Sequence, residues 1–74
     1  MIIIAQGHTG ERPFTCSIPY LKKDGDDRKS LPVEETLVLL QNKRLLFREW
    51  INDVFLLEDD GGLKHWKKGK DWID

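Results

Sequence analysis

The chain has 74 residues, a formal net charge of −1, 39% hydrophobic and 34% charged residues, and one cysteine, Cys16. This length allows a single small domain over residues 1–74, which buries only about 60% of its unfolded surface. The balanced charge argues against a strongly basic nucleic-acid binder, and a lone cysteine excludes an internal disulfide framework. The lone cysteine favours a reducing setting, so we expect a cytoplasmic protein. No apolar run approaches the roughly 20 residues that span a bilayer, so we expect no membrane span.

Two strand-like segments open the chain and predict an antiparallel hairpin. Residues 2–6 are rich in β-branched side chains, and residues 13–21 place apolar side chains at alternate positions from Phe14 onward. Period-two alternation is typical of a half-buried strand. Pro19 has no backbone N–H, so the second strand should lie at a sheet edge or contain a bulge there. The glycines within residues 7–12 favour a loop between the two strands.

Residues 30–35 have the features of a helix start. Ser30 can cap free backbone N–H groups, Pro32 suits the first turn, and the two glutamates that follow favour the positive end of the helix dipole. The apolar residues within 36–40 leave two choices open. This segment continues as a helix or forms a strand, because four apolar residues in a row have no period that decides between them.

The stretch 44–58 predicts an amphipathic helix. Apolar pairs recur every four residues from Leu46 onward, and polar pairs fill the gaps. At 100° per residue the apolar pairs cover one side of a helix, whereas a strand would set Arg48 on a face with apolar side chains. The glycines at 61–62 would end this helix. Its wide apolar arc exceeds what a hairpin covers, which favours self-association or a partner.

Together these elements predict an α+β fold with an N-terminal antiparallel β-hairpin, one or two amphipathic helices and a short C-terminal element over residues 63–74. Whether residues 31–42 and 44–58 form one helix or two is open, with a break expected at residues 42–43. The alternative fold is β-grasp-like or a small β-rich barrel, in which residues 43–47 form a strand.

Motifs for metal or catalytic chemistry are incomplete in this chain. Residues 8–16 resemble the junction between tandem C2H2 zinc fingers, a resemblance that implies zinc ligands at His8 and Cys16. Tetrahedral zinc needs four ligands, but Pro19 stands where that family has its second cysteine, and His65 is not at finger spacing. Cys16 falls on the apolar side of its strand, where a lone cysteine is usually a small core residue. We expect no metal, no cofactor and no enzyme activity.

The C-terminal segment holds the best candidate binding residues. Four lysines and two tryptophans lie within nine residues: Lys64, Trp66, Lys67, Lys68, Lys70 and Trp72. Tryptophan is enriched at buried anchor points of protein interfaces, and lysines with aromatic residues also suit phosphates and unpaired bases. We therefore predict a small non-enzymatic protein-binding or regulatory module, which acts with a protein partner or as an oligomer. The alternative is a nucleic-acid-binding module that uses this Lys/Trp-rich segment.

Overall fold

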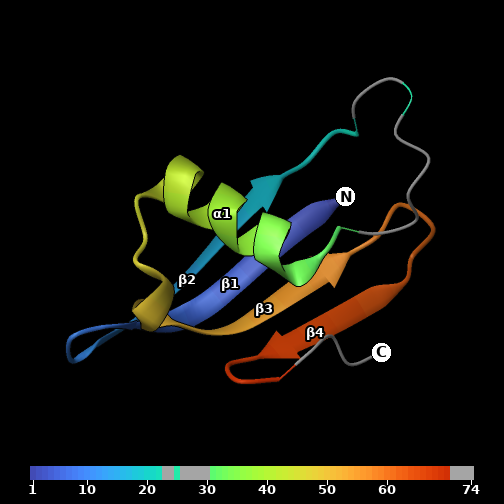
Figure 1. The fold of residues 1–74 in the computed structure, drawn as a ribbon. Coiled ribbons are helices and arrows are strands. Elements are labelled where there is room, and N and C mark those ends of the chain that lie inside the picture. Colours follow the sequence, from blue (N-terminus) through green and yellow to red (C-terminus); the bar gives the residue numbers. More distant parts are fainter. Residues whose placement is uncertain (23–24, 26–30, 71–74) are drawn as a thin grey trace.

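The computed structural model describes residues 1–22, 25 and 31–70. The elements follow in the order β1 (Ile2–Thr9), β2 (Arg12–Pro19), α1 (Val33–Arg44), the 3-10 helix η1 (Arg48–Trp50), β3 (Ile51–Leu57) and β4 (Leu63–Lys67). The four strands form one antiparallel sheet in the order β2-β1-β3-β4, and α1 crosses one side of it (Figure 1). This architecture confirms the predicted α+β fold with an N-terminal hairpin.

Strands β1 and β2 form the predicted hairpin. They pair along their whole length, beginning with Ile2 opposite Pro19. Pro19 lies on an edge strand, as predicted, because β2 is the outermost strand of the sheet. The turn is tighter than the predicted loop over 7–12 and contains Gly10, whose φ of 66° lies in the left-handed region that glycine adopts most readily.

Gly7 is a strand residue rather than the turn residue that the sequence suggested. It lies in β1 where the backbone of Trp50 passes so closely that a Cβ atom on Gly7 would be 1.8 Å from the Trp50 carbonyl oxygen. The pairing of β1 with β3 shifts at a bulge between Gln6 and Gly7. This bulge inserts an extra β3 residue, which explains why Ile51 and Val54 are both buried although two residues lie between them.

Helix α1 answers the open question about residues 36–40, which are helical. It begins after Pro32, whose extended backbone serves as the N-cap without a side-chain hydrogen bond; Ser30, the predicted cap, lies outside the described residues. Acidic side chains occupy its first turn and basic side chains its last, as the helix dipole favours. It ends at Leu45, which has a φ of 54° in a position where glycine is usual.

The helix predicted over residues 44–58 is wrong. Residues 48–50 form the short helix η1, and residues 51–57 form β3, which pairs with β1 on one side and β4 on the other. Backbone pairing on both sides and packing against α1 outweigh the helical spacing of the apolar pairs. The glycines at 61–62 turn the chain from β3 into β4 instead of ending a helix, and the alternative strand over 43–47 is not formed.

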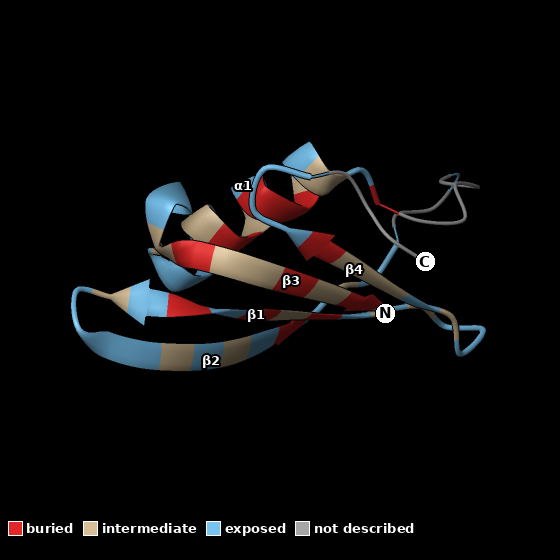
Figure 2. Ribbon diagram, turned by 90° about the horizontal axis from the view of Figure 1, so that it is seen from below, coloured by how far each residue is buried: buried red, intermediate tan, exposed pale blue. Residues whose placement is uncertain are grey.

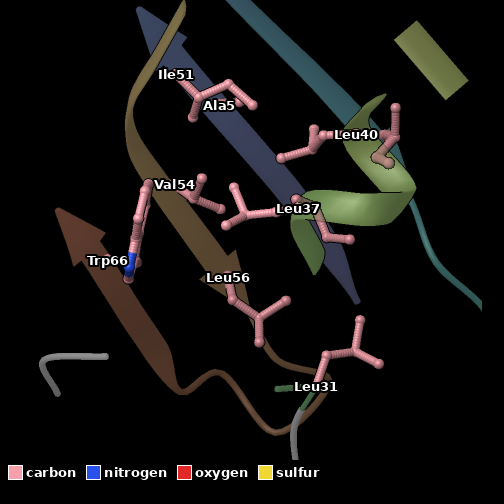
Figure 3. Packing of buried hydrophobic residues seen from close by; sticks show 10 residues of the cluster. Ala5, Leu31, Leu37, Leu40, Ile51, Val54, Leu56 and Trp66 are labelled. Carbon is pink, nitrogen blue, oxygen red and sulfur yellow. The ribbon is translucent and has the colours of Figure 1, made fainter. Parts of the chain in front are cut away.

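The core lies between α1 and one side of the sheet (Figure 2, Figure 3). Its fully buried apolar side chains come from two strands, β1 and β3, and the helix: Ile3, Ala5, Leu37, Leu40, Ile51, Val54 and Leu56. Burial of a large aliphatic side chain contributes about 1.5–3 kcal/mol, so this layer stabilises most of the fold. Thr36 is the one fully buried polar side chain among the residues described, and its Oγ1 donates a hydrogen bond to the Pro32 carbonyl at 3.0 Å.

Candidate functional site

The predicted binding residues of the C-terminal segment do not share one surface. Side chains alternate along β4, so Trp66 faces α1 and the core, whereas its neighbour Lys67 is exposed on the opposite side of the sheet. Lys64 follows the alternation of Trp66 and is half-buried on the α1 side. Trp72 lies outside the described residues, so the structure gives no account of it.

The remaining two predicted residues, Lys68 and Lys70, lie beside Trp66 in a shallow cleft. One hollow of about 350 Å³ is lined by Arg48, Glu49, Trp66, Lys68 and Gly69. A neighbouring hollow of about 280 Å³ shares three of these residues and extends to Val33, Glu34 and Lys70. We call these two hollows together the Trp66 cleft. It brings together three predicted binding residues from β4 and the turn after it, together with residues from α1 and η1 that the sequence did not suggest.

Charged side chains organise the rim of the Trp66 cleft. The Arg48 guanidinium donates two hydrogen bonds to the Glu34 carboxylate, at 2.7 and 2.9 Å. These hydrogen bonds lower the pKa of Glu34 and raise the pKa of Arg48. Lys68 Nζ donates to the carbonyl oxygen of Glu49 at 2.9 Å, which holds the lysine across the cleft. The cleft therefore carries three cations and two carboxylates.

No helix or strand of the described residues covers the side of the sheet that faces away from α1 (Figure 2), and we call this side the open sheet face. The strand register sets its side chains in three rows across β2, β1, β3 and β4. Row one contains Pro19, Ile2, Leu57 and Leu63; row two contains Ser17, Ile4, Phe55 and His65; row three contains Thr15, Gln6, Asp53 and Lys67.

Polarity changes steadily across the three rows. In row one, Ile2, Leu57 and Leu63 are 41%, 37% and 56% exposed. In row two the rings of Phe55 and His65 stack in parallel, with centroids 4.4 Å apart. His65 Nε2 lies 2.8 Å from the Asp53 carboxylate of row three. Exposed apolar side chains with an ordered polar border are typical of an interaction surface.

The helix side of the molecule also exposes apolar side chains, but they form no continuous row. Val38 on α1 is 52% exposed, and Leu45 and Phe47 are exposed after its end. Phe47 contacts Trp50 edge to face, with ring centroids 4.7 Å apart. Polar and basic residues at 41–44 separate Val38 from Leu45 along the chain, whereas Leu45 and Phe47 flank Leu46 and line a small hollow with it. The open sheet face is therefore the better organised apolar surface.

The open sheet face is not predicted by the sequence analysis. Phe55 and Leu57 were assigned to a helix, so their alternation with buried strand residues could not be recognised. The available signal was the period of two in β4, where Leu63, His65 and Lys67 alternate with Lys64 and Trp66. That alternation already separates the lysines into two groups.

Cys16 packs against the core, in agreement with its position on the apolar side of β2. Burial raises the pKa of its thiol, and this favours the neutral, weakly nucleophilic form at neutral pH. His8 lies elsewhere, with Nδ1 3.1 Å from the Asn52 side-chain nitrogen. Over residues 1–22, 25 and 31–70, no group of three or more His, Cys, Asp or Glu side chains is arranged to hold a metal ion. In the same residues, no helix has the length and apolar character needed to cross a membrane.

Comparison with known proteins finds no relative. No protein-family model matches the chain, no curated protein matches it, and no solved structure matches it. The surfaces of the molecule are therefore the basis for any proposal about its function.

Proposed function

We propose that this protein is a non-enzymatic interaction module that binds a second copy of itself through the open sheet face. Row one supports this most directly, because Ile2, Leu57 and Leu63 lie in register on three adjacent strands and each is more than one third exposed. Removal of apolar surface from water is favourable by roughly 25 cal/mol per Å². Ile4 and the Phe55–His65 stack extend this surface into row two.

The distribution of charge favours a second copy as the occupant. Row one is followed by the turn between β3 and β4, which carries Glu58, Asp59 and Asp60, whereas row three carries Lys67 at the other end of β4. A twofold axis that runs across the strands between rows one and two would stack row one of each copy on row two of the other. The same axis brings Lys67 over the partner's acidic turn. Because a twofold interface repeats every contact, two such charge pairs form.

The size of the face predicts a weak, reversible dimer. Four strands about 4.8 Å apart and three rows of side chains make a face of about 20 by 20 Å, or about 400 Å² per copy. A standard stable interface uses about 800 Å² per partner. We therefore expect self-association that rises with concentration in the micromolar to millimolar range.

Sedimentation velocity tests this proposal with two matched variants. Leu63→Asp adds a charge to row one, and Val38→Asp adds the same charge at a position of similar exposure on α1. We expect the wild type to dimerise between about 20 μM and about 1 mM, Leu63→Asp to weaken the dimer at least about tenfold, and Val38→Asp to leave it unchanged. A wild type that stays monomeric over this range contradicts the proposal, as does equal weakening by both variants.

Charge reversal tests the proposed axis. Lys67→Glu and Asp60→Lys should each weaken the dimer, because each creates two repulsive pairs, and this effect should fade in high salt. The double variant restores opposite charges and should recover most of the affinity. If the double variant dimerises no better than either single variant, Lys67 does not face the partner's acidic turn and the axis is wrong.

The nucleic-acid alternative receives less support, because the lysines of the C-terminal segment point to different sides of the sheet. It makes a different prediction. Binding of a single-stranded oligonucleotide at low ionic strength, reversed steeply by salt, would favour it over self-association.

A further inference from the structure

The Trp66 cleft has features that self-association through the open sheet face leaves unused. The Trp66 side chain forms its inner wall and is only 6% exposed. Its indole Nε1–H is a hydrogen-bond donor, and a buried tryptophan N–H usually has a partner. In Figure 3 the Trp66 ring is seen edge-on, and its nitrogen lies at the end of the ring that is farther from Val54. An anion bound in the Trp66 cleft would supply an acceptor for this donor.

The groups around Trp66 favour an acceptor with negative charge. Arg48, Lys68 and Lys70 line the cleft from two sides. Val33 and Glu34 lie in the first turn of α1, whose N-terminus has no side-chain cap. Backbone N–H groups at a helix N-terminus carry partial positive charge. These three cations and the Trp66 N–H can surround one oxyanion, although the carboxylates of Glu34 and Glu49 line the same cleft.

The Glu34 carboxylate is already hydrogen-bonded to the Arg48 guanidinium that an entering anion would bind. It accepts both hydrogen bonds from Arg48 in the two-point geometry that a carboxylate or phosphate ligand also uses. Both side chains are at least half exposed, so water screens the pair, and an exposed ion pair of this kind contributes little to stability. Glu34 can therefore be displaced by a ligand that gains further contacts with Trp66 and the lysines.

We propose that the Trp66 cleft binds a small organic oxyanion, with Trp66 Nε1–H and Arg48 as donors and Glu34 as the internal competitor that the ligand displaces. The hollow of about 350 Å³ is in the size range of small-molecule sites. The apolar surface of Trp66 contacts the body of the ligand, while the cations hold its carboxylate or phosphate group. This site is separate from the open sheet face, since Trp66 and Lys67 point to opposite sides of β4.

An NMR titration of the full chain tests this proposal through the indole N–H signal of Trp66. The probes are benzoate, adenosine monophosphate, adenosine and inorganic phosphate. We expect benzoate or adenosine monophosphate to shift the Trp66 signal in a saturable manner, and the comparison of these two distinguishes a carboxylate from a phosphate. Adenosine and inorganic phosphate should bind at least about tenfold more weakly, because each lacks one half of the recognised group. The proposal is overturned if neither benzoate nor adenosine monophosphate shifts the Trp66 signal. It is also overturned if adenosine or inorganic phosphate binds as tightly as the organic anions.

Substitutions at three exposed residues distinguish binding at a specific site from general attraction between the anion and positive charge. Arg48→Gln should weaken the anion at least about tenfold, and Glu34→Gln should strengthen it by about threefold or more because the competitor has lost its charge. Lys43→Gln removes a cation that does not line the cleft and should leave affinity unchanged. Equal weakening by Lys43→Gln and Arg48→Gln overturns the proposal, and so does a Glu34→Gln variant that binds no more tightly than the wild type. A shift produced by an oligonucleotide but by neither organic anion assigns the cleft to nucleic acid instead.

Discussion

Substitution of Gly7 by alanine tests the account of the β1–β3 bulge. The added Cβ would lie 1.8 Å from the Trp50 carbonyl oxygen, far inside the 3.0 Å limit that real Cβ contacts respect. Both groups belong to the backbone, so relief requires movement of more than about 1 Å, and this movement displaces the fully buried Ile51 next to Trp50. We expect a loss of about 3 kcal/mol in the free energy of unfolding, at the upper end of typical overpacking costs.

That loss is a large part of the stability available to this domain. A chain of this length has a free energy of unfolding of about 4–11 kcal/mol, and a loss of about 3 kcal/mol lowers Tm by about 12–24 °C. Urea unfolding followed by tryptophan fluorescence measures it. Gly62→Ala is the matched control, because its Cβ meets only the side-chain ends of Asp60 and Glu58, and should cost less than about 1 kcal/mol. A Gly7→Ala protein within about 0.5 kcal/mol of the wild type would refute the close approach.

Four further predictions follow from the same structure. Leu40→Ala should cost about 2–5 kcal/mol in urea unfolding, because it opens a cavity between α1 and the sheet, and a smaller loss would mean that α1 packs loosely. Leu45→Gly should raise stability by about 1 kcal/mol by relieving a left-handed leucine, and destabilisation would contradict that backbone assignment. Alkylation of Cys16 at pH 7.5 should be slow in the folded protein and fast in urea, because burial raises the pKa of its thiol; equal rates would show an accessible thiol. The hydrogen bonds from Arg48 lower the pKa of Glu34, so this pairing stabilises the fold above the pKa of an unfolded glutamate and loses its effect as the pH falls through the lowered pKa. Arg48→Gln should therefore move the NMR titration midpoint of Glu34 upward. An unchanged midpoint would rule out the pairing.

The N-terminal half of the fold follows from local signals. Alternation in β2 and the β-branched start of β1 predict the hairpin, because such patterns fit a sheet with one buried side. Pro19 predicts the edge position of β2, because it cannot donate a ladder hydrogen bond. The acidic first turn indicates the start of α1 whichever residue caps it.

The C-terminal half depends on partners that are distant in the sequence. The segment that forms β3 has apolar pairs at helical spacing, but β1 and β4 supply backbone hydrogen bonds along both of its edges. The bulge opposite Gly7 also breaks its alternation, which removes the period-two signal of a strand. Tertiary pairing therefore overrides the local helical pattern. Because this segment is a strand, the apolar helical arc that suggested self-association in the sequence analysis does not exist.

The sequence predicts the residue types of the candidate site but not their arrangement in space. The Lys/Trp-rich segment points to a surface near β4, and three of its residues do line the Trp66 cleft. Which residue faces which side depends on the register of β4 against β3, and the sequence alone does not supply that register. Arg48 and Glu34 come together only because η1 lies beside the first turn of α1.

The most direct test of self-association through the open sheet face is a dilution series followed by NMR at residue resolution. We expect concentration-dependent shifts at the amides and methyl groups of row one and row two, centred on Ile2, Leu57 and Leu63, with none at Val38 or Leu45 on the helix side. Spectra that do not change between about 20 μM and about 1 mM, or shifts confined to the helix side, would contradict the proposal that a second copy covers this face.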